Sequence, residues 1–162
     1  MWRDPALRPL SHQHQHGLAL TVVLQRALQA DASPQTVRRL AEDVLRMWQV
    51  ELAGHFQVEE ELLFPAVREA LAEPGLLDAL IGEHRRIERL VDALRAEPTA
   101  EGLAELASLL AQHIRAEERS LFQQIQQALT PEAIADLGAR LDAAVAKLCP
   151  VTSGLPWQEP PR

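Results

Sequence analysis

The 162-residue sequence has a single cysteine, Cys149, and no tyrosine, and aromatic residues make up only 4% of it. One cysteine can form neither a disulfide within the chain nor a zinc site of several thiolates. Long apolar runs are missing too, since no stretch approaches the ~18 apolar residues of a membrane-spanning helix. These absences exclude a disulfide-stapled fold and predict that the protein has no membrane partner.

Positive charge is also scarce. The chain has 16 Lys and Arg residues against 23 Asp and Glu residues, which gives a net charge of −7 and an isoelectric point of about 5.3. Binding to a phosphate backbone needs clustered positive charge, so we expect no nucleic-acid partner. Charged residues and prolines interrupt the first ten residues, which therefore lack the apolar segment of a signal peptide. The expected location is the cytoplasm.

Strong helix formers dominate the rest of the composition, namely Ala, Leu, Glu, Gln and Arg. Apolar residues recur three and four positions apart, as in Ile87, Leu90, Val91 and Leu94. This spacing is typical of amphipathic helices, and no segment alternates with the period of two expected for strands. The sequence therefore predicts an all-α protein.

Capping residues and prolines divide the chain into five predicted helices. Ser11, Ser33 and Thr99 are candidate N-caps, and Pro65 is expected to kink or end the second helix. The predicted helices cover residues 11–30, 34–72, 76–96, 100–129 and 131–148. Because the connections are short, we expect an up-down antiparallel four-helix bundle with a short extra C-terminal helix. Residues 11–148 then form one domain between an irregular segment, 1–10, and a proline-rich tail, 149–162.

A repeated segment lies on the second and fourth helices. Residues 55–64 and 113–122 both read H-x-x-x-E-E-x-x-L-F. Residues four apart share one face of a helix, so His55 and Glu59 point into the same volume, as do His113 and Glu117. The second glutamate of each pair is turned away by about 100°, and we expect it at the surface or hydrogen-bonded behind a ligand.

The other two long helices supply further histidines. The third contains His84, and the first contains His12, His14 and His16. Two His-Glu pairs and two single histidines give about six ligands, too many for one tetrahedral zinc. They suit two octahedral metals bridged by Glu59 and Glu117, with His55, His84, His113 and one first-helix histidine as terminal ligands. The apolar register of residues 20–28 favours His16, whereas geometry near the helix start could turn His14 inward, so both stay open.

At these residues the sequence resembles the hemerythrin-like (HHE cation-binding) family. The matching strings are H-F-x-x-E-E-E-x-L-F-P at 55–65, E-H-x-x-I at 83–87, H-I-x-x-E-E-x-x-L-F at 113–122 and the opening L-S-H-Q-H-Q-H at 10–16. The resemblance covers residues 10 to about 128. It implies an oxo- or hydroxo-bridged centre of two non-haem iron ions in an up-down bundle. The implied ligands are His14 or His16, His55, Glu59, His84, His113 and Glu117, and the family's first-helix motif favours His14.

One departure from the family bears on function. Oxygen-carrying members place two histidines four apart on the third helix, whereas here Glu88 follows His84 at that spacing. Either Glu88 coordinates a metal or one more coordination position is open. We expect a protein that binds or senses a small diatomic ligand, oxygen or nitric oxide. The alternatives are a di-iron enzyme acting on peroxide or nitric oxide, an iron storage or delivery protein, and a metal-free interaction bundle. The sequence does not indicate an oligomeric state.

Overall fold

The computed structural model describes residues 3–73 and 75–148, and every regular element within these ranges is helical. The predicted all-α class is therefore confirmed. The proline-rich tail predicted for 149–162, together with Cys149, lies outside the described residues. Within the described part of the chain, no helix is both long and apolar enough to span a bilayer.

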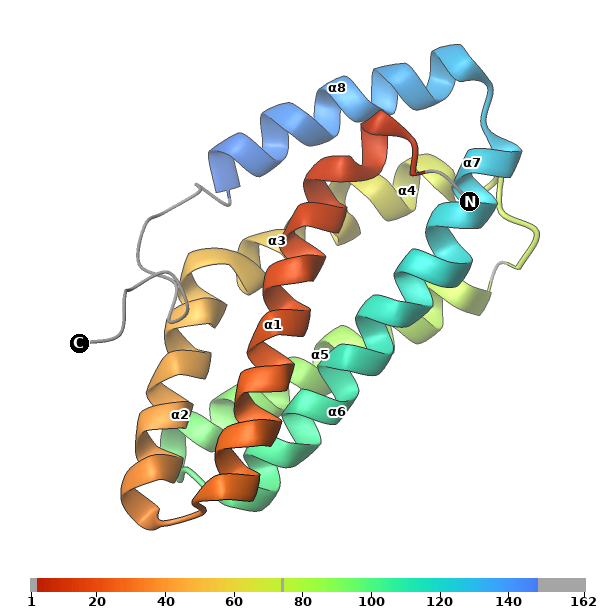
Figure 1. Cartoon of the computed structure of the whole chain (residues 1–162). Coiled ribbons are helices and arrows are strands. Elements are labelled where there is room, and N and C mark those ends of the chain that lie inside the picture. The colour runs from red at the N-terminus through yellow and green to blue at the C-terminus, as the bar shows by residue number, and fades with distance from the viewer. Residues whose placement is uncertain (1–2, 74, 149–162) are drawn as a thin grey trace.

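Four long rods build the body of the molecule (Figure 1). The first rod is α1 (Arg8–Ala30), and the third is α5 (Gly75–Ala96). The second runs without a break through α2 (Pro34–Met47), the π-helix η2 (Trp48–Leu52), α3 (Ala53–Val58), the π-helix η3 (Glu59–Leu63) and α4 (Phe64–Val67). The fourth joins α6 (Ala100–Ala116), the π-helix η4 (Glu117–Leu121) and α7 (Phe122–Ala128).

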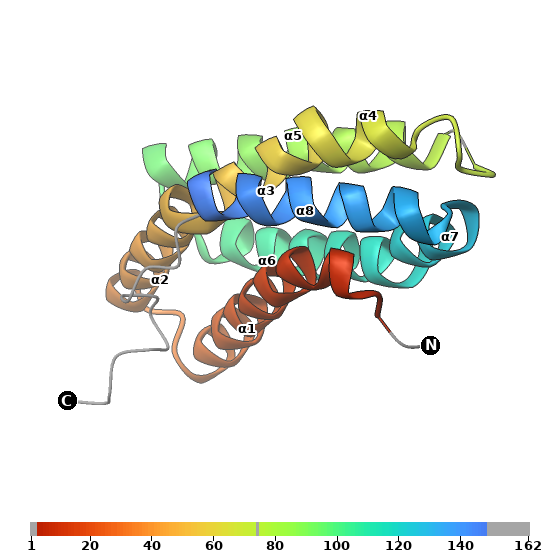
Figure 2. The same ribbon diagram turned by 90° about the horizontal axis from the view of Figure 1, so that it is seen from above.

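The rods close on one another as a bundle. Helix α1 contacts α2 and α6, and α5 contacts the same two helices from the other side. A short 3-10 turn, η1 (Pro5–Leu7), precedes α1, and α8 (Pro131–Leu148) follows the fourth rod. As Figure 2 also shows, α8 lies along the bundle instead of joining it as a fifth rod, and it packs on η1, α3 and η3.

Two of the predicted caps are confirmed. The Ser33 hydroxyl accepts a hydrogen bond from the amide of Thr36 at 3.3 Å, and the Thr99 hydroxyl accepts one from the amide of Gly102 at 3.0 Å. The predicted start of the first helix after Ser11 is wrong, because α1 begins at Arg8. Pro9 falls in its first turn, where a missing amide donor costs nothing.

The predicted interruption at Pro65 is displaced. The second rod continues through this proline to Val67, and Pro65 occupies the first turn of α4. The irregular stretch lies immediately upstream, in the π-helix η3. A π turn already replaces the regular i to i−4 bonds there, so a residue without an amide donor is tolerated directly after it.

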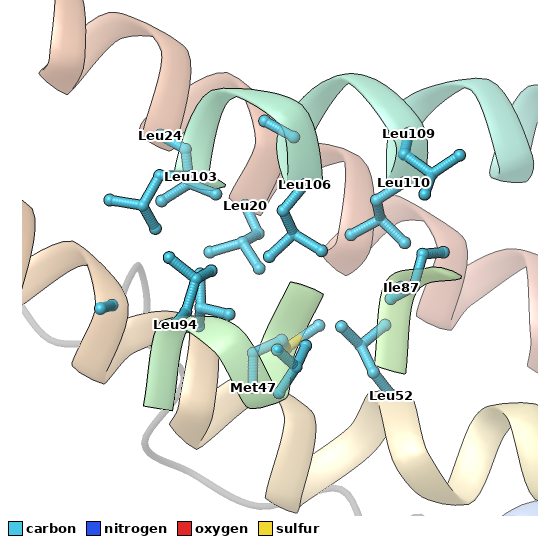
Figure 3. Packing of buried hydrophobic residues seen from close by; sticks show 14 of the residues in the cluster. Leu20, Leu24, Met47, Leu52, Ile87, Leu94, Leu103, Leu106, Leu109 and Leu110 are labelled. Atoms are coloured by element: carbon cyan, nitrogen blue, oxygen red, sulfur yellow. The ribbon is translucent and has the colours of Figure 1, made fainter. Parts of the chain in front are cut away.

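The apolar core is split into two clusters along the rods. One cluster fills the end near the α1–α2 turn and includes Leu20, Leu24, Met47, Leu94 and Leu106, which Figure 3 shows pointing into a shared interior. The other cluster lies toward α8. Its fully buried members include Leu7, Leu10, Phe64, Leu77, Phe122 and Leu141. On α1 and α5, a buried histidine separates residues of the two clusters along the sequence.

A close contact between α8 and η1 gives a test of this packing. A Cβ atom added at Gly138 would lie 2.6 Å from the Cβ and 2.8 Å from the Cα of Ala6, whereas one added at Gly82 would meet nothing within 4 Å. Both glycines are helical, so the propensity gained by alanine is similar at each. We expect Gly138→Ala to be less stable than Gly82→Ala by ~1–3 kcal/mol in denaturant unfolding, the usual cost of overpacking. Equal stabilities would contradict the packing of α8 on η1.

Candidate metal centre

Six polar side chains are buried together between the two apolar clusters. Each is at most 2% exposed, although histidine and glutamate are rarely enclosed so completely. They come from all four rods: His14 from α1, His55 from α3, Glu59 from η3, His84 from α5, His113 from α6 and Glu117 from η4.

These residues form two overlapping groups of four potential ligands. Within each group, one ligand atom per residue lies within 4.8 Å of the others. The first subsite comprises His14 and His55, the second subsite comprises His84 and His113, and both include Glu59 and Glu117. Two carboxylates shared by two pairs of imidazoles are the donor set expected for a pair of bridged metal ions.

Glu59 divides its two oxygens between the subsites. Its Oε1 lies 3.2 Å from Nε2 of His55, and its Oε2 lies 3.4 Å from Nε2 of His84. Glu117 instead turns a single oxygen to both sides, with Oε2 3.1 Å from Nε2 of His14 and 3.3 Å from Nε2 of His113. All four imidazoles therefore direct Nε2 at the shared carboxylates.

A π-helical segment begins at each of the two central glutamates. Segment η3 starts at Glu59 and η4 starts at Glu117, at equivalent positions of the sequence repeat. The residues before them are ordinary α-helix, so the i, i+4 spacing still places His55 beside Glu59. The wider turn that follows changes the helical phase downstream, a distortion that is frequent at functional sites.

Behind the cluster, every histidine has an acceptor for its second ring nitrogen. The four contacts span 2.7–2.8 Å. They join Nδ1 of His14 to Glu118, of His55 to Gln13, of His84 to Glu60 and of His113 to Glu83. An ionised carboxylate can only accept, so these contacts keep a proton on Nδ1, and in a neutral ring they leave the Nε2 lone pair facing inward.

When the rings are neutral, which is the form that binds metal, the centre of the cluster has no hydrogen atoms to share. Among the described residues, none of the four oxygens of Glu59 and Glu117 has a hydrogen-bond partner. Buried carboxylates without compensation are costly, and lone pairs of imidazole and carboxylate repel one another at these distances. Cations placed between them remove both costs. The donor set therefore fits divalent metal ions.

Without a metal, protons must balance the buried charge. Burial alone would raise the pKa of Glu59, but the facing rings of His55, His14 and His84 bring this pKa well below its usual range. Burial likewise would lower the pKa of His113, yet the carboxylates of Glu117 and Glu83 raise it to about 10. The metal-free cluster thus holds protons on imidazole, and a metal ion has to displace them.

The structure brings together six of the seven predicted ligands and leaves out His16. This side chain is 27% exposed, and its Nδ1 lies 2.9 Å from Glu51. A two-residue step turns a helix by about 200°, so His14 and His16 cannot both face the interior. The periodicity that favoured His16 used only residues 20–28. The buried line of α1 also includes Leu10 and Gly17, and this longer register selects His14.

Glu88 does not fill the place of a further ligand. It pairs with Arg85 at 2.6 Å on the outer side of α5 and lies outside both subsites. Each subsite therefore offers two imidazoles and the two shared carboxylates. The histidine missing from the third helix leaves the two subsites with equal sets of inner donors.

Sequence reasoning did not anticipate Gln13 as a partner of the cluster, and it assigned no role to Glu83 beyond the family motif. Both side chains come from residues adjacent to a buried histidine, yet each contacts a histidine of a different rod. Glu60 and Glu118, left open between the surface and a supporting role, are both hydrogen-bonded to ligand histidines. The repeated Glu-Glu pair was the only signal in the sequence for this arrangement.

The fold and the site define a helical domain whose histidine and glutamate groups could hold metal ions. Residues 6–125 match the hemerythrin HHE cation binding domain, and the chain therefore belongs to this family. The chain is also similar to a DNA nickase from Nostoc sp., with 28% identity over 131 residues. This match covers 78% of the chain but 36% of the nickase, so the chain spans about a third of that relative's length. No solved structure matches the chain.

Alanine variants of the two α1 histidines distinguish the alternatives for the first rod. We expect His14→Ala to lose tight binding of one of two divalent ions per chain, because it removes a donor from the first subsite. His16→Ala is the matched control and should retain two ions. Elemental analysis after dialysis against a weak chelator measures the difference. Loss of an ion from His16→Ala alone would reverse the assignment.

Metal binding should release protons and weaken as the pH falls. The raised pKa of His113 means that its ring is protonated at neutral pH in the metal-free protein, whereas the ligand form is neutral. Apparent affinity should therefore rise with pH up to the region of that pKa. Calorimetric titrations with one metal in buffers of different ionisation enthalpy measure the protons released. Binding without proton release would contradict this electrostatic picture.

Proposed function

We propose that the cluster holds two iron ions and binds or senses a small diatomic ligand, oxygen or nitric oxide. Glu59 and Glu117 bridge the ions in this proposal, with one pair of histidines completing each subsite. The observation that supports it most directly is the set of four buried carboxylate oxygens without hydrogen bonds, facing four imidazole nitrogens. Nitrogen and oxygen donors in this mixture suit iron, and manganese or zinc are the competing metals.

The number of protein donors leaves room for an added ligand. Two imidazoles and one oxygen from each shared carboxylate give every ion four protein ligands, whereas octahedral iron takes six. Because Glu88 lies outside the cluster, no further side chain of the described residues completes the second subsite. Held by these histidines and glutamates, two ferrous ions would supply electrons and open coordination positions to a small ligand. The remaining chemistry is set by the surrounding side chains.

Apolar rings enclose the cluster and restrict what can reach it. Phe56 stacks on His84 with ring centroids 3.8 Å apart, and Phe122 stacks on His14 at 5.4 Å. Both phenylalanines are at most 3% exposed. A surface pocket opens beside the second subsite, lined in part by Phe56, Glu60 and Arg85. Such walls restrict the access of water and of large substrates, which supports a small ligand.

The same geometry supports two alternatives to different degrees. Turnover of peroxide or nitric oxide would use the same open positions, and it is distinguished from binding only by measuring product. Iron storage or delivery is less well supported, because the cluster is closed by buried side chains and offers donors for only two ions.

The three-residue turns at 31–33 and 97–99 support our proposal that the rods alternate in direction, as in an up-down bundle.

The similarity to a DNA nickase makes DNA a ligand class worth testing. The net charge of −7 weighs against binding a phosphate backbone. We therefore expect iron-loaded protein to leave a supercoiled plasmid intact in a gel assay. Nicking by the wild type that is lost in Glu59→Gln would instead assign a metal-dependent nuclease activity to this chain.

Optical spectra of the iron-loaded protein test the main proposal. We expect two iron ions per chain and a charge-transfer band that appears when the ferrous protein meets oxygen or nitric oxide and disappears when the gas is removed. Glu59→Gln should abolish the band, since it removes a bridging carboxylate, whereas His16→Ala should preserve it. Two bound ions without any ligand-dependent band would reject diatomic binding and leave a metal site of another function.

A further inference from the structure

We propose that the two subsites differ in metal affinity, and that the second subsite, His84 and His113, binds its ion first and more tightly. The cause is one difference behind the histidines, where Glu83 supports the second subsite and Gln13 supports the first. This inference rests on the proposed metal centre, but it does not depend on a diatomic ligand.

The inner donors cannot produce such a difference by their number or kind. Each subsite has two imidazoles that point Nε2 inward, and both subsites share the same two carboxylates. The two Nε2 atoms of a pair are 3.0 Å apart in the first subsite and 3.1 Å apart in the second. Any preference between the subsites must therefore come mainly from the groups behind the rings.

One histidine of each subsite has equivalent support. Glu118 accepts from His14 and is paired with Arg3, and Glu60 accepts from His84 and is paired with Arg85. The two glutamates occupy the same position of the sequence repeat and are similarly exposed, at 26% and 20%. In both cases a guanidinium offsets the carboxylate charge. These two sets of contacts are similar, so they should contribute little to a difference in metal affinity between the subsites.

The other histidine of each subsite does not have equivalent support. Nδ1 of His55 lies 2.8 Å from Oε1 of Gln13, a neutral amide, whereas Nδ1 of His113 lies 2.8 Å from Oε2 of Glu83, a carboxylate. Among the described residues, the ion pairs of Glu83 include no arginine or lysine. No guanidinium or ammonium group of the described residues therefore offsets the charge of Glu83 beside His113.

A carboxylate behind a ligand histidine strengthens it as a donor. It holds the Nδ1 proton more firmly than an amide does and makes Nε2 more basic. Removing such a partner typically lowers metal affinity about 10–100-fold. Glu83 also adds a negative charge near the second ion, reduced by solvent because its side chain is 31% exposed. Both effects favour the second subsite, so the amide-for-carboxylate exchange sets the order of filling.

At a limiting concentration of metal, the two subsites fill one after the other. The second subsite fills first, and the first subsite exchanges its ion over a range of metal concentration in which the second remains occupied. The protein therefore passes through a form with a single ion. That intermediate occupancy is a state in which a ligand needing both ions cannot bind.

Stepwise titration with Co²⁺ tests the order in the full-length protein. Calorimetry gives the two affinities, and proton NMR identifies the filled subsite through the paramagnetically shifted Nδ1–H signals. We expect two binding steps separated by about tenfold or more. Glu83→Gln shifts the His113 signal, and this signal should be present in the wild-type spectrum at one equivalent of Co²⁺. The signal that Gln13→Glu shifts should appear only with the second equivalent.

The variants change the order in a predictable way. Glu83→Gln should lower the tighter affinity and bring the two steps together, Gln13→Glu should raise the weaker one, and the double exchange should reverse the order. Asp92→Asn removes a carboxylate charge from the exposed side of α5, where Asp92 pairs with Arg95, and it is the control that should leave both steps unchanged. If the buried charge of Gln13→Glu prevents folding, Glu83→Gln alone decides, because Glu83 is partly exposed and nearly the same shape as glutamine.

Two results would overturn the inference. Equal affinities in the wild-type protein would show that Glu83 and Gln13 do not differentiate the subsites, although two bound ions would leave the proposed centre intact. An order that Glu83→Gln fails to alter would assign the asymmetry to another cause. Failure of the wild type to bind Co²⁺, Fe²⁺ and Zn²⁺ would contradict the metal centre itself, a different outcome from either.

Discussion

The structure depends on the enclosure of two glutamates at the middle of a helical bundle. Glu59 and Glu117 are 0% exposed, and ionised carboxylates so deep in protein are strongly destabilising unless positive charge accompanies them. The raised pKa values of His14 and His113 mean that protons on these two rings supply that charge in the metal-free protein, and cations displace them. Folding and metal binding are therefore linked through the same six side chains, and the apolar residues on either side provide the free energy to hold them.

The polar cluster lies between two apolar clusters along the rods. Leucines of one cluster fill the end near the α1–α2 turn, and the phenylalanines and leucines of the other cluster fill the end under α8. Between them, the four rods contribute the buried histidines and glutamates of the cluster. The π segments η3 and η4 begin where the glutamates sit. A third π segment, η2, lies one turn before His55 on the second rod, so two of the three π segments begin at a central glutamate.

Much of the bundle follows from local rules, and the exceptions have identifiable causes. Ser33 and Thr99 were recognised because a cap depends only on adjacent residues, and the H-x-x-x-E pairs because four residues make one turn. The choice between His14 and His16 needed the register of the whole of α1, which extends three residues further upstream than its predicted N-cap Ser11. Gln13 and Glu83 reach across to other rods, and no local pattern reveals contacts between rods. The helix through Pro65 likewise depends on the π turn that precedes it.

The packing of α8 on η1 connects both ends of the described chain to His14, one of the candidate metal ligands. Gly138 allows α8 to lie against Ala6, and the adjacent Asp4 and Arg3 contact Gln126 and Glu118 of the fourth rod. Glu118 in turn supports His14. The packing of the last helix is therefore connected to the support of one imidazole by a continuous series of contacts through η1, Arg3 and Glu118. Residues near the start of the described chain therefore take part in holding a buried histidine in its orientation.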